Sequence, residues 1–215
     1  LNSPNNHYSP ILPVERQIQL SWQYQLVDFP LSTGGDGNDS STGITALSDG
    51  SMIITGVYAG DVDFGDTEMT SDGITDIDGF IAKINPDGTY AWVTKADGNE
   101  DINSWGITSL SGGSSIITGR IFGTSNFGET SLVPSGSSDI FIAKLNSDGS
   151  YAWATKAGGG GGDSGQKIAS LEDGSSIITG YFEETAIFGS TNLTSTGGQD
   201  VFIAKLNPDG SYRSE

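Results

Sequence analysis

The sequence predicts an all-β fold built from three copies of one unit of about 61 residues. The string Phe-Ile-Ala-Lys begins at Phe80, Phe141 and Phe202, at a constant spacing of 61 residues. Residues 92–152 and 153–213, aligned without gaps, are identical at 32 of 61 positions. Within each copy, short stretches of alternating apolar and polar residues are separated by glycine-containing turns, which is typical of β-strands.

The third copy shows the expected elements most clearly. In chain order they are a strand at 151–155, a glycine loop at 158–165, a strand at 168–171, a turn at 172–174, a strand at 176–182, a short hairpin at 186–194, a strand at 201–206 and a turn at 207–210. Asp-Gly pairs occupy the turns because both residues tolerate the backbone conformations that tight reversals need. No stretch of ten residues shows a helical period.

The copies span residues 22–91, 92–152 and 153–212, within a repeat domain at 18–215. The first copy is longer, and if Trp22 is the equivalent of Trp92 it carries about seven extra residues before Ile53. Residues 1–17 hold three of the seven prolines and the single His, and we expect them to form an extended N-terminal arm. A cleanly alternating strand is expected at 18–26.

Four main strands per copy, joined by tight turns, are the signature of a β-propeller blade. A β-solenoid is the alternative for a repeating all-β chain, but its rungs are usually shorter and lack Asp-Gly hairpins. The sequence therefore favours a β-propeller-like array of three blades.

Two segments, from Asp139 to Trp153 and from Leu171 to Gly180, carry a pattern that resembles the bacterial β-propeller repeat family called SBBP. The resemblance extends over about 190 residues. It implies a scaffold found in large secreted or surface proteins of bacteria, including marine cyanobacteria. It implies no particular chemistry.

Three blades fall short of the ~4–8 with which propellers generally close. We therefore expect another copy of the chain to complete the open ends, in a ring of two chains or in a head-to-tail assembly. The strand at 18–26 is a candidate for the strand that the last copy lacks, within one chain or in a neighbouring one.

Composition excludes several classes of function. The chain has 215 residues, no Cys and one His, so a disulfide scaffold, a thiolate nucleophile and a His-rich metal site are excluded. A net charge of −18 argues against nucleic acid as a partner, because phosphates would be repelled. No apolar run reaches the ~18 residues that a membrane-spanning helix needs.

Acidic residues in the loops are candidate ligands for Ca²⁺, because hard oxygen ligands at short spacing suit that ion. Ca²⁺ is the one cofactor that the sequence suggests. The candidates are Asp36, Asp39, Asp72, Asp76 and Asp78. Their spacing is not that of an EF-hand, and solvated turn aspartates are the simpler interpretation. Asp78, with its repeat equivalents Asp139 and Asp200, is expected to cap a loop or to pair with a repeated lysine.

Among the aromatic residues, Trp22, Trp92 and Trp153 alternate with tyrosines on one strand face, and we expect them to anchor the core rather than to bind sugars. Trp105 has Gln166 as its counterpart in the third copy. We expect it in a loop, where it is a candidate platform for a ligand such as a glycan.

These observations favour a non-enzymatic repeat module outside the cell, at the cell surface or on a virion, that serves assembly, adhesion or glycan contact. Its partners would be copies of itself or other surface or virion proteins. A structural subunit of an extracellular filament or virion is the alternative, favoured by the proline-rich arm. A carbohydrate-active enzyme, a lyase or a glycosidase, is the least favoured. Glycoside hydrolysis needs a pair of carboxylates, and the adjacent Glu183 and Glu184 would point to opposite faces of a strand.

Overall fold

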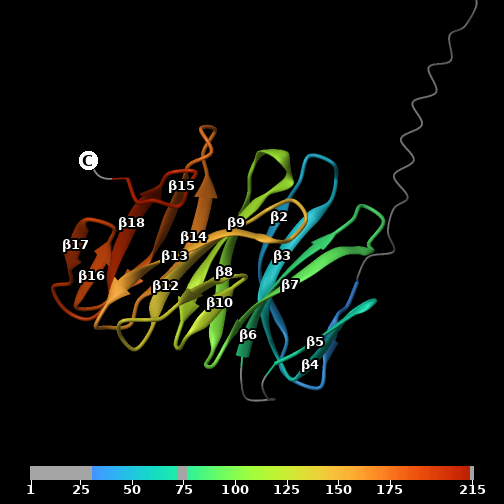
Figure 1. The fold of residues 1–215 in the computed structure, drawn as a ribbon, viewed down its shortest axis with the longest axis horizontal. Coiled ribbons are helices and arrows are strands. Elements are labelled where there is room, and N and C mark those ends of the chain that lie inside the picture. Colours follow the sequence, from blue (N-terminus) through green and yellow to red (C-terminus); the bar gives the residue numbers. More distant parts are fainter. Residues whose placement is uncertain (1–30, 72–76, 214–215) are drawn as a thin grey trace, which may run out of the picture.

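The computed structural model describes residues 31–71 and 77–213. Over this part the main secondary structure is β-strand, with one turn of 3-10 helix at Ser111–Gly113. The strands of this part form four antiparallel sheets; three of them hold the main strands of the repeats and lie side by side in chain order (Figure 1), and the fourth is a small sheet of short strands. Hydroxyl groups link the first strands of neighbouring sheets. Thr42 Oγ1 donates to the carbonyl of Ser104, and Thr108 Oγ1 donates to Ser170 Oγ at 3.2 Å.

We call the three sheets blades 1, 2 and 3. Blade 1 consists of β2 (Ser40–Ala46), β3 (Met52–Ala59), β6 (Ile77–Ile84) and β7 (Tyr90–Gly98). Blade 2 consists of β8 (Ile102–Ser109), β9 (Ser115–Ile121), β12 (Asp139–Leu145) and β13 (Tyr151–Gly159). Blade 3 consists of β14 (Ser164–Ser170), β15 (Ser176–Phe182) and β18 (Asp200–Leu206).

Each copy also contributes a short hairpin between its second and third blade strands. The hairpins are β4 (Asp61–Phe64) with β5 (Thr67–Thr70), β10 (Ser125–Phe127) with β11 (Thr130–Leu132), and β16 (Thr185–Phe188) with β17 (Thr191–Thr194). Each hairpin pairs not with its own blade but with the strand that precedes that blade in the chain. These pairs are β10 with β7, β16 with β13, and β4 with β1 (Gly34–Gly35). Blades 1 and 2 thereby become six-stranded sheets, each closed by the hairpin of the following copy.

The repeated Asp-Gly turns are held by the aspartate side chain. Asp148 Oδ1 accepts hydrogen bonds from both the backbone N–H and the hydroxyl of Ser150, at 3.0 and 2.6 Å. Asp87 and Asp209 repeat this arrangement at the same turn of the other two blades. These bonds favour the carboxylate and lower the pKa of each aspartate.

Successive residues of a strand point to opposite faces, so each blade has two apolar faces. Face A, toward the following blade, carries Ile53 and Ile81 in blade 1; face B, toward the preceding blade, carries Ile117 and Phe141 in blade 2. Face A of blade 1 packs on face B of blade 2 in one buried cluster. Face A of blade 2 packs on face B of blade 3 in a second cluster of the same design.

The prediction of an all-β, propeller-like array is confirmed. The units of sequence and structure are offset, because Trp92 and Trp153, which open the sequence copies, lie in β7 and β13, the fourth strands of blades 1 and 2. The arm at 1–17, the strand at 18–26 and Trp22 lie outside the described residues. In the described part, no helix is both long and apolar enough to cross a membrane.

Candidate functional site

Face A of blade 3 is an exposed apolar surface. Val201 and Ile203 on β18 are 76% and 75% exposed. Their equivalents one repeat earlier, Ile140 and Ile142, are completely buried. Isolated apolar residues on a surface need no explanation, but two on one strand face, at positions that are buried elsewhere in the molecule, indicate an interaction surface.

The free edge of β18 is the second part of this surface. In blade 2, β13 pairs with β12 from Ile140 to Leu145. In blade 3, the described residues cover only the start of the corresponding edge, where Tyr212 bridges to Leu206 and the N–H of Arg213 donates to the carbonyl of Lys205 at 3.0 Å. The edge from Val201 to Ala204 therefore has no partner strand among the described residues, and its backbone groups remain available for pairing.

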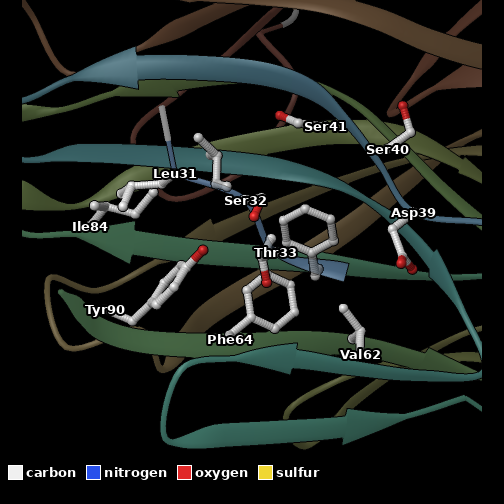
Figure 2. Close-up of a pocket in the computed structure, with 12 residues that line it drawn as sticks. Leu31, Ser32, Thr33, Asp39, Ser40, Ser41, Val62, Phe64, Ile84 and Tyr90 are labelled. Carbon is white, nitrogen blue, oxygen red and sulfur yellow. The ribbon is translucent and has the colours of Figure 1, made fainter. Parts of the chain in front are cut away.

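Blade 1 presents the complementary surface at the other end of the array. Its face B carries an apolar cluster that includes Phe64, Phe80 and Ala82, with Ile54 and Tyr90 packed at its margin. The rings of Phe64 and Tyr90 meet edge to face, with centroids 5.5 Å apart. Beside them lies an open cavity of about 350 Å³ (Figure 2). In blades 2 and 3 the equivalent face is covered by the preceding blade.

The segment that leads into blade 1 crosses this cavity. Leu31, Ser32 and Thr33 line it together with residues of β3 and β6, and Figure 2 shows them on the same face as Phe64 and Tyr90. Leu31 is 42% exposed. The segment continues into β1, whose pairing of Gly35 with Val62 matches the pairing of Gly98 with Ser125 one copy later.

An aspartate fixes this segment to the loop that follows it. Asp39 Oδ2 accepts the backbone N–H of Gly35 at 2.8 Å. Two copies later, Asp163 Oδ2 accepts the N–H of Gly159 at 2.7 Å. Gly159 is the end of the fourth strand of blade 2, so Gly35 is held as the end of a fourth strand would be.

The acidic residues proposed as Ca²⁺ ligands have different surroundings. Asp36 Oδ1 accepts the N–H of Asp61 at 3.1 Å, and Asp39 holds Gly35. Asp78 is buried in β6, with its Oδ2 3.5 Å from the hydroxyl of Tyr58. Asp72 and Asp76 lie outside the described residues. Within residues 31–71 and 77–213, no group of three or more acidic or histidine side chains is placed to hold a metal ion.

The remaining repeated aspartates cap loops, as the sequence indicated. Asp139 Oδ2 accepts the N–H of Ser135 at 3.0 Å, and Asp200 Oδ2 accepts the N–H of Thr196 at 2.9 Å. Asp139 also forms an ion pair with Lys156, so the predicted pairing with a repeated lysine is present in this copy.

Sequence reasoning missed Asp163, which is completely buried where the second copy has Ile102. Burial raises its pKa, although the N–H groups of Glu183 and Gly159 favour the carboxylate. An acidic residue at a position that is apolar in the neighbouring copy was the available signal. Its equivalence to Asp39 became visible only from the strand register.

The tryptophans connect neighbouring blades. The indole N–H of Trp92 donates to the carbonyl of Ser147 at 3.0 Å, and that of Trp153 to Pro208 at 3.3 Å, in both cases in a turn of the following blade. Both rings pack against the buried clusters, so these two tryptophans anchor the packing as expected.

The prediction of a loop at Trp105 is wrong, because Trp105 is the bulged residue of β8, between Ser104 and Gly106. A bulge re-aims a side chain without ending the strand. Trp105 lines a shallow pocket with Thr42 and Lys167, and its indole nitrogen is buried with no hydrogen-bond partner among the described residues.

One comparison with known proteins agrees with this architecture. The family described as a β-propeller domain of unknown function, DUF5122, matches residues 119–150, a stretch that includes β12 of blade 2. This match supports a β-propeller repeat in the second copy. The comparison with curated proteins gave no match. Among solved structures, a protein of unknown function from Bacteroides caccae is similar, with 11% identity over 86% of this chain and 82% of that chain and a TM-score of 0.25.

Proposed function

We propose that the protein is a non-enzymatic assembly module, in which copies join through the open faces at the two ends of the blade array. The observation that carries this proposal is the contrast between Ile142, buried under the next blade, and Ile203, exposed at the same position one repeat later. Two internal interfaces already show how face A of one blade packs on face B of another. The end faces are of the same two kinds.

Several features support a scaffold rather than an enzyme. The Asp-Gly turn aspartates are occupied in hydrogen bonds to their own turns, as Asp148 is with Ser150. Lys83 and Lys205 are repeat equivalents, and each forms an ion pair with a turn aspartate. The repeat pattern favours one form of this function: a module that acts at a cell or virion surface, in adhesion or glycan contact. Such a module would be related to the SBBP-type repeats of bacteria.

A filament subunit is the second form that the structure favours. The two end faces are different surfaces at opposite ends of the array, so contact between copies is head-to-tail. Such a contact builds a closed ring when the rotation between copies closes and an open filament when it does not.

Negative-stain electron microscopy of the purified protein tests the proposal. We expect rings or extended filaments in which the repeating unit is one chain. Particles that stay the size of a single 22.3 kDa chain at all concentrations would contradict assembly as the function. A glycan array is the test of the adhesive role, with Trp105→Ala as the control that removes the candidate platform.

A further inference from the structure

The geometry points to strand exchange between copies: residues 31–35 of one copy form the fourth strand of blade 3 in the next copy. Val201 and Ile203 of that copy then cover the cavity on face B of blade 1. This inference rests on the proposed assembly and names the residues through which it occurs.

The sheet order supplies the first argument. Two complete sheets have the order of four blade strands followed by a hairpin, as in β8, β9, β12, β13, β16 and β17. The two remaining sheets have three strands each, β14-β15-β18 and β1-β4-β5. Within the part of the chain that the structure describes, the first is a blade without its fourth strand, and the second is a hairpin attached to what corresponds to the end of a fourth strand. Joined at that strand, they make a third sheet of the same six-stranded design.

The register supplies the second argument and fixes the pairs. Gly35 is the equivalent of Gly98, because each pairs with the same position of the following hairpin. Counting back, Leu31 is then the equivalent of Thr94, which pairs with Ile81 in blade 1. Ile203 is the equivalent of Ile81. The same counting places Thr33 opposite Val201.

Leu31 and Thr33 also lie where a fourth strand lies. In blade 1, Thr94 Oγ1 donates to the carbonyl of Gly149 in the following blade, and Ala96 is buried against face B of blade 2. Leu31 and Thr33 line face B of blade 1 in the same way. The segment is thus already placed as the outer strand of a blade whose other three strands are not among the described residues of this chain.

The apolar surfaces supply the third argument. In the packing of blade 2 on blade 3, Ile140 and Ile142 cover a cluster that includes Ile178 and Phe202. In the exchanged assembly, Val201 and Ile203 would cover Ile54 and Phe80, the equivalents of Ile178 and Phe202. Burying two exposed aliphatic side chains removes apolar surface from water and so favours this contact, against the costs of association.

One chain cannot make this contact with itself. Blade 1 and blade 3 lie at opposite ends of the long axis of the structure (Figure 1). Because the occupant must offer both a fourth strand and a face B, a second copy of this chain fits, and it presents residues 31–35 beside the cavity.

Disulfide cross-linking between full-length copies tests the inference, since the chain has no native cysteine. Residues directly opposite across antiparallel strands have Cα atoms about 4.5–5.5 Å apart, within the range that a disulfide spans. Leu31→Cys and Ile203→Cys chains are mixed under mild oxidation, and covalent dimers are quantified on a non-reducing gel. We expect the mixture to form several-fold more dimer than either variant alone, because only the mixture places two cysteines opposite each other.

The matched control replaces Ile203→Cys by Ile187→Cys, an exposed residue of β16 on the opposite face from Ala186 and Phe188, which are buried between blades 2 and 3. Dimer yield in the Leu31 and Ile203 mixture no higher than in this control would overturn the strand exchange. If electron microscopy shows assemblies and this mixture still gives no excess dimer, the assembly function stands and the exchange is wrong. If neither is seen, both are wrong.

Discussion

Blades 2 and 3 present the same tetrapeptide, Phe-Ile-Ala-Lys, in two environments. In β12 its isoleucine, Ile142, is completely buried between sheets, whereas in β18 the corresponding Ile203 is 75% exposed. Strand, register and the preceding strand are the same in both blades. Two things differ among the described residues: the neighbour on face A, and the fourth strand, which is β13 in blade 2 and is only begun at Tyr212 in blade 3. The comparison shows that the repeat specifies a blade with two apolar faces, which become buried only where another blade packs on them.

The largest expected effect is on the free energy of unfolding, when Ile142 and Ile203 are each truncated to alanine. We expect Ile142→Ala to lower the free energy of unfolding by about 2–5 kcal/mol, because it opens a cavity between blades. At concentrations low enough to keep the chain monomeric, Ile203→Ala should change it by no more than about 0.5 kcal/mol. Urea denaturation measures both, and equal losses would show that Ile203 is buried in the monomer.

Two turn glycines of blade 2 extend the comparison, because one packs against the neighbouring blade and the other lies in open space. Gly149 has a positive φ of 86°, and a Cβ there would stand 2.6 Å from the ring of Trp92. Gly112 has a φ of 75° with open space around it. We expect Gly112→Ala to cost about 1–2 kcal/mol for the backbone conformation alone. Gly149→Ala should cost about 1–3 kcal/mol more, because the tryptophan must move. Thermal or urea unfolding of both variants is the measurement, and equal costs would mean that Trp92 does not pack on this turn.

Asp163 gives blade 3 a pH dependence that blade 2, with Ile102, lacks. Its pKa is raised by burial, so the folded state holds this proton more tightly than the unfolded state. Its contribution to stability should therefore grow as the pH falls through the raised pKa, and be complete below the ordinary value of 3.8. The difference in unfolding free energy between the natural chain and Asp163→Asn should shift in favour of the natural chain from pH 7 to pH 3.5. A shift of the opposite sign would contradict the burial of this carboxyl.

The turn aspartates should behave in the opposite way, with the smallest effect. Hydrogen bonds from Ser175 lower the pKa of Asp173 to about 2. Its contribution to stability is present above 3.8 and is lost as the pH falls through about 2. A carboxyl NMR titration should show Asp173 titrating below the usual range and Asp163 above it. An ordinary midpoint for Asp173 would show that its turn is open in solution.

Much of the fold could be predicted from the sequence, because the repeat sets strand order and turn chemistry directly. The apolar run around Ile142 and the Asp148-Gly149 turn that follows it are enough to define a strand and a reversal. The partner of each hairpin could not be predicted, since pairing of β16 with β13 depends on how blades stack in space. For the same reason Asp39, which accepts the backbone N–H of Gly35 in β1, looked like a solvated loop residue.

The candidate site, like the fold, could be predicted only in part from the sequence. The sequence indicated open ends, but it placed the completing strand at 18–26, whereas the strand register favours residues 31–35 for the part opposite Val201 and Ile203. Trp105 looked like a loop residue because a β-bulge interrupts the alternation on which strand assignment depends.

The mass of the assembly in solution tests the central claim most directly. Light scattering of the full chain, over a range of concentrations, should give masses that rise above 22.3 kDa, whereas Ile203→Asp should remain at the monomer mass, because the charge would be buried against face B. Ile187→Asp is the matched control, since the first copy carries Asp63 at that position, and it should assemble like the natural chain. A natural chain that stays monomeric, or an Ile203→Asp chain that assembles as well as the natural one, would contradict the account.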